Sequence, residues 1–470
     1  MVQQFFLLAR QELAITLVIF ILLFIKVGAA EWSNKSIFNL VNILLLVNFL
    51  SGFFFVQDGV LFNEMFHTNN LVVTEKNILN FGTLIISLQS YDWIQQHKHV
   101  VEFYVLLLST LLGMFFMISA GNILMFYLGL ELASIPLAAI ANFDLEKRQS
   151  SEGAMKFIIS SAFSSGLLLF GISMLYGTTG TLIFSELPQY LTGTPLQLFA
   201  LVLLIAGFAF KISVVPFHLW TADVYEGSPV AVTAYLSVIS KGAAVFVFVQ
   251  VLYTVFKPLA EQWYTIVFLL SVLTMLVGNL FALRQTNIKR LLAFSSIAQA
   301  GFILVGISGS SQAGMASVVY FILVYIFSNL GAFGVVSIVS ALTGKENTED
   351  YKGFYKTNPF LAWVMAISLF SLAGVPPAAG FFGKFFLLIA GAGKANYVLI
   401  VIAALNMIIS LYYYLMLVRI MFIDRNEQAP IEKLPVHIYP KLALLVCMAG
   451  IMLVGLISGV YEYIYSLSAY

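Results

Sequence analysis

Long apolar runs separated by short polar loops occupy most of this sequence of 470 residues. A helix needs about 20 apolar residues to cross the hydrocarbon core of a bilayer, because each residue advances it by about 1.5 Å. Hydrophobic residues make up 61% of the chain and charged residues only 10%, a composition typical of membrane proteins with many spans. The sequence therefore predicts an all-α polytopic membrane protein that sits in a lipid bilayer.

The apolar runs predict about 14 transmembrane helices. They cover residues 13–30, 37–56, 77–90, 100–118, 121–142, 153–176, 196–215, 229–255, 262–283, 290–309, 314–341, 357–373 continuing at 379–392, 396–420, and 438–466. The third span is the weakest of these, because it is short and rich in Asn and Ser. Each span is bounded by polar residues that favour a loop.

Several kinds of site are disfavoured by the composition. The formal net charge is +1, which argues against nucleic-acid binding. Cys447 is the only cysteine, so a disulfide, an iron–sulfur cluster and a thiolate zinc site are not expected. The five histidines have no metal-ligand spacing, and neither a phosphate loop nor a dinucleotide fingerprint is present. We expect no cofactor and no metal in this chain.

Basic residues are distributed unevenly among the predicted loops. Those after odd-numbered spans contain Lys147, Arg148, Arg284, Lys289, Arg290, Lys345, Lys352, Lys356, Arg425 and Lys433. Those after even-numbered spans contain Lys76, Lys257 and Lys394. Because basic loops stay on the cytoplasmic side, this pattern predicts that both chain ends lie on the outer face.

The stretch 207–229 combines a lysine inside a span with a break in the helix. Lys211 lies in otherwise apolar sequence, and Pro216 follows five residues later. A lysine at the centre of a bilayer costs roughly 3 kcal/mol even on lenient insertion scales. Proline removes a backbone donor and breaks or bends the helix, which is tolerated at membrane depth only inside protein or beside a wet cavity. This stretch therefore predicts a site that holds and moves charge.

A second break in span twelve mirrors the first. Pro376 and Pro377 interrupt that span, and Lys384 follows within apolar sequence. Paired broken helices in inverted halves are a sequence signature of transport sites. We therefore predict two inverted five-helix repeats, spans 4–8 and 9–13. The corresponding division of the chain is an N-terminal three-helix segment 1–95, a first repeat 96–256, a second repeat 257–425 and a last helix within 426–470.

Two further charged residues lie in the middle of predicted spans. Glu131 is in span five and Lys241 is in span eight, each with apolar flanks. The alternative to a role in conduction is a structural ion pair, or a long side chain that reaches the interface. Four buried charges, two of them beside helix breaks, favour conduction. Glu131 is expected to have a buried lysine as its partner.

The polar residues around the first break support weaker interpretations. His218 is a candidate proton relay, because imidazole titrates near neutral pH, but it could instead cap backbone carbonyls freed by Pro216. Asp223 and Glu226 are expected at the interface or in a loop. Burial disfavours the charged form of a lysine, whereas a nearby carboxylate favours it. Separating and rejoining a Glu–Lys pair would therefore release and reload a proton.

Four segments together resemble one known family. Residues 211–229 (KISVVPFHLWTADVYEGSP), 129–136 (GLELASIP), 289–298 (KRLLAFSSIA) and 372–385 (LAGVPPAAGFFGKF) are similar to motifs of the N-type antiporter-like subunit, or subunit 2, of proton-pumping NADH–quinone oxidoreductase, respiratory complex I. The resemblance covers nearly the whole chain. The motif that begins at Trp220 (WTADVYEG) distinguishes the N type from the related L and M types.

The resemblance implies roles for particular residues. Glu131 would modulate the pumping lysine, Lys211; Lys241 would lie on the central hydrophilic axis, and Lys384 at its far end. His218 matches the histidine after the break. Gln299 stands where the family often has a histidine, so direct imidazole relay is not expected there, although an amide can hold a water chain.

The resemblance also implies what surrounds the chain. Flavin, iron–sulfur clusters and quinone would belong to other subunits. The partners would be membrane-arm subunits of the M type and small subunits of the K, J and A types, in a bacterial cytoplasmic membrane. Two alternatives use the same buried lysines: an Mrp-type cation/proton antiporter subunit, and a membrane-arm subunit of a related hydrogenase or photosynthetic complex.

Overall fold

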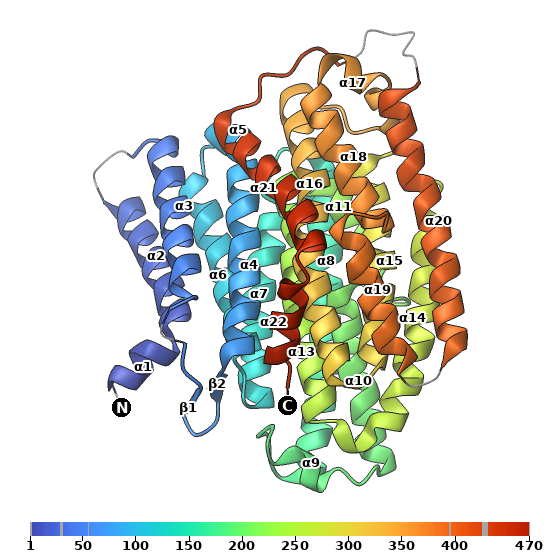
Figure 1. The fold of residues 1–470 in the computed structure, drawn as a ribbon. Helices are drawn as coiled ribbons and strands as arrows, with labels where there is room; N and C mark the ends of the chain where they lie inside the picture. Colours follow the sequence, from blue (N-terminus) through green and yellow to red (C-terminus); the bar gives the residue numbers. More distant parts are fainter. Residues whose placement is uncertain (1, 29–31, 55, 394–395, 425–430, 470) are drawn as a thin grey trace.

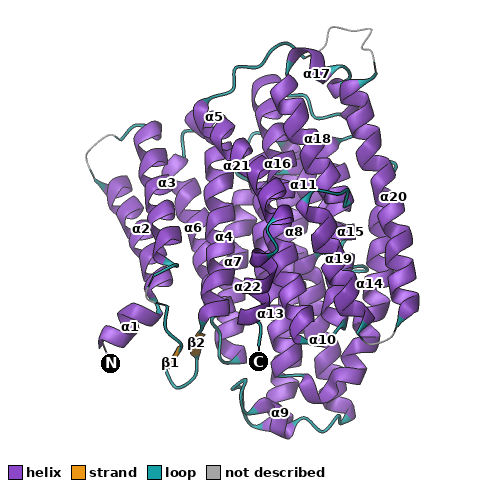
Figure 2. Ribbon diagram, viewed as in Figure 1, coloured by secondary structure: helices purple, strands orange, loops and turns teal. Residues whose placement is uncertain are grey.

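The computed structural model describes residues 2–28, 32–54, 56–393, 396–424 and 431–469. The helices run side by side in one bundle, and both ends of the chain lie at the same end of it (Figure 1). Within the described residues, 12 helices are long and apolar enough to cross a membrane, by length and composition. Figure 2 shows how little of the chain is not helical. The predicted all-α membrane class is confirmed, whereas the count of 14 spans stays a prediction.

The N-terminal segment contains the first helices and a small hairpin. The elements are α1 (Val2–Leu8), α2 (Arg10–Val27), α3 (Asn34–Ser51), β1 (Gly59–Leu61), β2 (Phe66–Thr68), α4 (Asn70–Gln89) and α5 (Tyr91–Gln95). The two strands pair antiparallel, with Val60 opposite His67. The side chain of Asn69 caps α4 by accepting a hydrogen bond from the Val72 amide, which fixes where this helix begins.

The middle of the chain contains the first broken helix. The elements are α6 (Val100–Ile118), α7 (Ile123–Ala141), α8 (Arg148–Thr179), α9 (Leu187–Tyr190), α10 (Pro195–Ile212), α11 (Leu219–Gly227), α12 (Val230–Tyr235), the π-helical turn η1 (Leu236–Ser240) and α13 (Lys241–Thr254). α10 begins with a capping box between Thr194 and Gln197, and Pro195 occupies its first turn, where proline is well tolerated.

The last part of the chain contains the second broken helix. The elements are η2 (Lys257–Leu259), α14 (Ala260–Ala282), α15 (Ile288–Ser308), α16 (Gln312–Thr343), η3 (Thr348–Tyr351), α17 (Phe354–Thr357), α18 (Pro359–Ala373), α19 (Ala379–Ala392), α20 (Tyr397–Phe422), α21 (Ile438–Leu456) and α22 (Gly459–Leu467). The predicted span 438–466 is not one helix, since Ile457 is extended and separates α21 from α22.

The helices differ in how much of their surface is covered by protein. Within their most apolar windows, α15 is 100% buried, and α16 and the segment 230–254 are each 94% buried. The corresponding shares are 39% for α8 and 33% for α20. The central helices therefore contact protein on all sides. The outer helices leave large apolar side chains exposed, such as Phe163 on α8 and Ile408 on α20, as expected for a surface facing lipid.

α4 corrects the prediction for the third span. The predicted span 77–90 was short and polar, and Lys76 was placed in a loop before it. The helix instead begins at Asn70, and Lys76 lies inside it, 1% exposed. Of the most apolar window of α4, 83% is buried, so its polar residues face other helices and not lipid. The loop residues Lys394 and Arg425, used in the orientation argument, lie outside the described residues.

Candidate functional site

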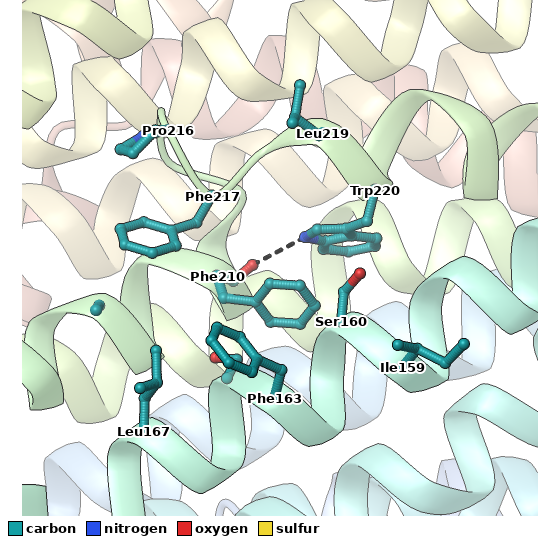
Figure 3. A pocket seen from close by; sticks show the side chains of 11 residues that line it. Ile159, Ser160, Phe163, Leu167, Phe210, Pro216, Phe217, Leu219 and Trp220 are labelled. Atoms are coloured by element: carbon teal, nitrogen blue, oxygen red, sulfur yellow. Dashed lines mark hydrogen bonds between the residues drawn. The ribbon is translucent and has the colours of Figure 1, made fainter.

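The break between α10 and α11 is held by side chains from two elements. Ser213 has a left-handed backbone with φ of 65° and ends α10. The freed carbonyl of Phe210 accepts a hydrogen bond from the indole Nε1 of Trp220 at 3.1 Å (Figure 3). The amide of Val215 donates to Thr274 Oγ1 on α14 at 3.1 Å. The indole of Trp220 therefore caps one carbonyl at the break. The imidazole of His218 lies beside the backbone of Pro216, and its Nδ1 is buried without a hydrogen-bond partner among the described residues.

Lys211 lies one turn before this break and contacts two hydroxyls. Its Nζ donates to Ser134 Oγ on α7 at 2.7 Å and to Ser161 Oγ on α8 at 2.8 Å. Ser134 is three residues after Glu131, so both side chains lie on the same side of α7. Among the ion pairs of the described residues, none joins Glu131 to Lys211. Glu131 therefore acts on Lys211 through its charge and without a direct contact, and its Oε1 is buried without a hydrogen-bond partner among the described residues.

Lys241 follows a π-helical turn in the centre of the bundle. Residues Leu236–Ser240 form this turn, and such turns are frequent at functional sites. Lys241 is 4% exposed, and its Nζ donates to Ser296 Oγ on α15 at 2.7 Å. The ammonium also lies 5.5 Å from the centre of the Tyr225 ring. Its contacts are therefore a hydroxyl and an aromatic face, without a carboxylate.

Lys384 is held by carbonyls that the second break sets free. α18 ends before Gly374, and the Nζ of Lys384 donates to Leu372 O at 2.7 Å and to Ala373 O at 3.3 Å. Gly374 has φ of 85°, and a Cβ there would lie 3.2 Å from the Lys384 side chain. Glycine therefore serves both the left-handed turn and the close approach of the lysine.

Gln299 connects the central helix to the second break. Its Nε2 donates to the same Leu372 carbonyl at 3.0 Å and to Tyr414 Oη at 3.2 Å. Ser296 and Gln299 are three residues apart on α15, so α15 presents one polar side to both Lys241 and Lys384. Tyr414 in turn hydrogen-bonds Ser295. Neutral polar groups of α15 thus lie beside both lysines.

Sequence reasoning missed these neutral partners. They are Ser134, Ser161, Tyr225, Ser296 and Tyr414. Serine and tyrosine are common inside membrane helices, and only their spacing of three residues from Glu131 or Gln299 could have singled some of them out. It also missed an ion pair between Glu12 and Lys76, whose side chains are at most 2% exposed.

A network of ion pairs lies at the end of the bundle opposite the chain termini. Arg290 on α15 contacts Asp223 at 2.9 Å and Glu226 at 2.6 Å, both on α11. Lys156 on α8 also contacts Asp223, at 2.6 Å. These side chains are between 29% and 44% exposed, which agrees with the interfacial position expected for the two carboxylates. The network joins the two broken-helix halves through α11 and α15.

A pocket of about 380 Å³ opens beside the first break (Figure 3). It is lined by Ile159, Ser160, Phe163, Ser164, Leu167, Ala206, Phe210, Pro216, Phe217, Leu219 and Trp220. Its rim is exposed and apolar: Leu219 is 77% and Phe163 68% exposed. The pocket therefore opens on the outside of the bundle, away from the serines that bind Lys211. Within the described ranges no group of His, Cys, Asp or Glu is arranged to bind a metal.

Comparisons with known proteins agree with this architecture. Residues 120–410 match the family model described as NADH:quinone oxidoreductase/Mrp antiporter, TM. A protein of Phocaeicola vulgatus named NADH-quinone oxidoreductase subunit N is 49% identical over 455 residues, covering 96% of this chain and 95% of that protein. In the solved structure of respiratory complex I from Thermus thermophilus with bound aureothin, one chain matches with a TM-score of 0.78 and 28% identity, covering 96% of this chain and 97% of that one.

A chain of the Mrp complex from Dietzia sp. DQ12-45-1b also shares the fold. Its TM-score is 0.83 at 18% identity, with 98% of this chain and 96% of that chain covered. At this identity the likeness concerns the fold alone. The family match over most of the chain and the identity to a subunit N carry the assignment. This chain belongs to the NADH:quinone oxidoreductase/Mrp antiporter family, as an antiporter-like membrane subunit of the N type.

Proposed function

We propose that this chain translocates protons in the membrane arm of an NADH–quinone oxidoreductase, through Glu131, Lys211, Lys241 and Lys384. The observation that carries the proposal is that the half-buried Lys211 and the buried Lys241 and Lys384 contact, among the described residues, neutral oxygens and aromatic rings. His218 and Gln299 would be relay positions. The helix breaks at Pro216 and at Pro376–Pro377 would expose backbone groups to the row of charged residues named above. A row of titratable groups along the bundle interior is suited to moving protons.

Proton movement would follow from changes in the distance between charges. Burial disfavours a charged lysine, and a carboxylate close to it offsets that cost. Glu131 acts on Lys211 through its charge but forms no ion pair with it, so a small shift of α7 against α10 would change their interaction. Gln299 lacks a titratable group, so a proton would pass it along hydroxyls or water between Ser296 and the Leu372 carbonyl.

Two inverted repeats would supply half-channels that open to opposite faces. α8 and α16 each have 32 residues and end at left-handed glycines, Gly180 and Gly344. Isolated bridges join Asn122 to Ile183 in one half and Asn287 to Asn347 in the other. These matched features support the division into 1–95, 96–256, 257–425 and 426–470, with repeats 96–256 and 257–425.

The redox reaction would take place in other subunits and drive this one through conformational or electrostatic change. The flavin, iron–sulfur clusters and quinone would be bound there, and M-type and small K, J and A-type subunits would be the neighbours. We place the chain in a bacterial cytoplasmic membrane with both ends on the outer face. An Mrp-type antiporter subunit is the second candidate. The chain is 18% identical to a chain of the Mrp complex and 49% identical to a subunit N, which favours the NADH–quinone oxidoreductase.

A lysine replacement in the centre of the row tests this function. We expect Lys241→Met in the assembled complex to slow proton translocation severalfold, because methionine fills the space but cannot carry a proton. The measurement is the number of protons moved per electron pair in proteoliposomes. Lys35→Met, at an exposed position on α3, is the matched control. Unchanged translocation in Lys241→Met with intact assembly would exclude Lys241 from the path.

The two residues of α7 that act on Lys211 give a second expected result. Glu131→Ala and Ser134→Ala should each lower proton translocation, and the double variant should lose less than the sum of the single losses expressed as free energies. The reason is that both residues act on the Lys211 ammonium, Ser134 through a hydrogen bond and Glu131 through its charge, and groups that share a partner are not additive. Glu131→Asp should retain part of the activity. Strict additivity, measured in the same vesicles, would mean that the two residues act independently.

A further inference from the structure

One face of α4 is polar along most of its length, although it is buried in protein. Lys76, Asn80, Thr83 and Ser87 are each at most 1% exposed. Their spacing of three and four residues places them on one side of the helix. The 12 residues from Lys76 to Ser87 extend about 16 Å along the helix axis. We call these four residues the α4 polar face; none of them belongs to the row of Lys211, Lys241 and Lys384.

An ion pair lies at one end of the α4 polar face, at the end of the bundle where β1 and β2 lie (Figure 1). Lys76 Nζ is 2.5 Å from Glu12 Oε1 on α2. The hydroxyl of Ser119, at the end of α6, is 3.4 Å from the same oxygen. Both charged side chains are at most 2% exposed, so the pair is as deeply buried as Lys384.

A second carboxyl group adjoins this pair. Glu75 is 3% exposed and forms no ion pair with any described residue. Burying an unpaired carboxylate as an ion costs far more than burying the neutral acid. Arg10 on α2 also acts through its charge on Glu12 and on Lys76, so this cluster contains two cations and two carboxyl groups. Glu75, which has no ion pair among the described residues, is the carboxyl group placed to hold a proton.

Beyond the ion pair, hydrogen bonds join the α4 polar face to neighbouring helices. Asn80 Nδ2 donates to Leu45 O on α3 at 2.9 Å, and Asn48 Nδ2 lies 3.5 Å from Asn80 Oδ1. Ser87 Oγ and Tyr104 Oη on α6 are 2.9 Å apart. The polar contacts therefore run between α4, α3 and α6 and do not end at the ion pair.

Several acceptor oxygens beside this face lack a donor in the protein. Gln11 Oε1, Glu12 Oε2, Asn42 Oδ1 and Asn48 Oδ1 are buried without a hydrogen-bond partner among the described residues. They lie on α2 and α3, the helices that also supply Glu12 and the Leu45 carbonyl. Buried acceptors are nearly always satisfied, and water provides the donors where protein does not. A closed structural ion pair would not need such a row of open acceptors.

We propose that the α4 polar face, with Glu12, Lys76 and Glu75 at one end, is a second proton-transfer path, separate from the row of Lys211, Lys241 and Lys384. Protons would pass between these side chains and water held by the open acceptors. Each proton taken up is released again, so the step needs no co-reactant. The proposal rests on the proposed function in one respect, since it assumes that the assembled complex moves protons.

The first test blocks the middle of the path. Asn80→Leu keeps the size and the helix but removes the polar group, and Ile78→Leu on the same helix is the matched control. We expect Asn80→Leu to move fewer protons per electron pair in proteoliposomes, with assembly and electron transfer retained, and Ile78→Leu to match the wild type. Asn80→Ser, which keeps a polar group, should move more protons per electron pair than Asn80→Leu. If Asn80→Leu assembles and pumps like the wild type, the proposal is wrong.

The second test needs no pumping. In the purified complex, transfer to D2O should shift an infrared band of a protonated carboxyl group within minutes, and Glu75→Gln should remove that band. A Glu75 band that does not exchange would mean a sealed structural cluster and would overturn the proposal, even where Asn80→Leu fails to assemble. Lys211→Ala measured in the same vesicles separates the two ideas. If it pumps normally while Asn80→Leu does not, the proposed row fails and the α4 path stands.

Discussion

Lys211→Ala should abolish proton translocation, or reduce it by roughly tenfold or more, a loss that corresponds to at least about 1.4 kcal/mol in the barrier. The ammonium is the only charge that contacts both Ser134 and Ser161, and it lies one turn before the break at Pro216. Alanine is the best helix former, so α10 should persist. The measurement is the proton-to-electron stoichiometry of the assembled complex in vesicles.

The control for this variant is a lysine of the same chain at an exposed position. Lys257→Ala, in the turn η2, should assemble and pump like the wild type. Normal stoichiometry in Lys211→Ala vesicles would remove Lys211 from the path. Loss of assembly would instead indicate that the two serine contacts hold α7, α8 and α10 together. Lys211→Gln, which can donate to both hydroxyls, would distinguish this structural role from a role in carrying protons.

Lys384→Ala should cause a loss of similar size in the second half of the chain. Its Nζ satisfies the Leu372 and Ala373 carbonyls at the end of α18, and Gln299 shares the first of them. Removing the ammonium leaves a gap between α15 and the second break, where a proton would have to pass. We expect the complex to assemble with impaired pumping. A purely structural role predicts lost assembly instead.

Lys384→Arg separates a fixed charge from a carried proton. The guanidinium keeps the positive charge and can donate to both carbonyls, but it does not release its proton in proteins. We expect this variant to assemble well and to pump poorly. If it pumps like the wild type, Lys384 supplies only a fixed charge, and protons would travel around it through water.

The fold class, the two helix breaks and the buried lysines could be predicted from the sequence because each leaves a local mark. A span is a continuous apolar run, and its length is set by the thickness of the bilayer. Pro216 and Pro377 interrupt such runs, and these interruptions can be read directly from the sequence. A lysine inside a run is conspicuous because hydrocarbon penalises charge. These signals need no knowledge of which helices are neighbours.

The contacts of these residues were decided only by the tertiary structure. Glu131 was expected to pair with a lysine. Helix packing brings it close enough to Lys211 to act through its charge, but the side chain that contacts the ammonium is Ser134. Lys76 was expected in a loop because α4 is too polar to face lipid, yet α4 is buried inside the bundle, where Glu12 neutralises its lysine. Hydropathy measures cost against lipid, whereas a buried helix is solvated by its neighbours. The contacts between side chains depend on how each helix is rotated and on packing between segments far apart in the sequence. No local sequence pattern encodes these contacts.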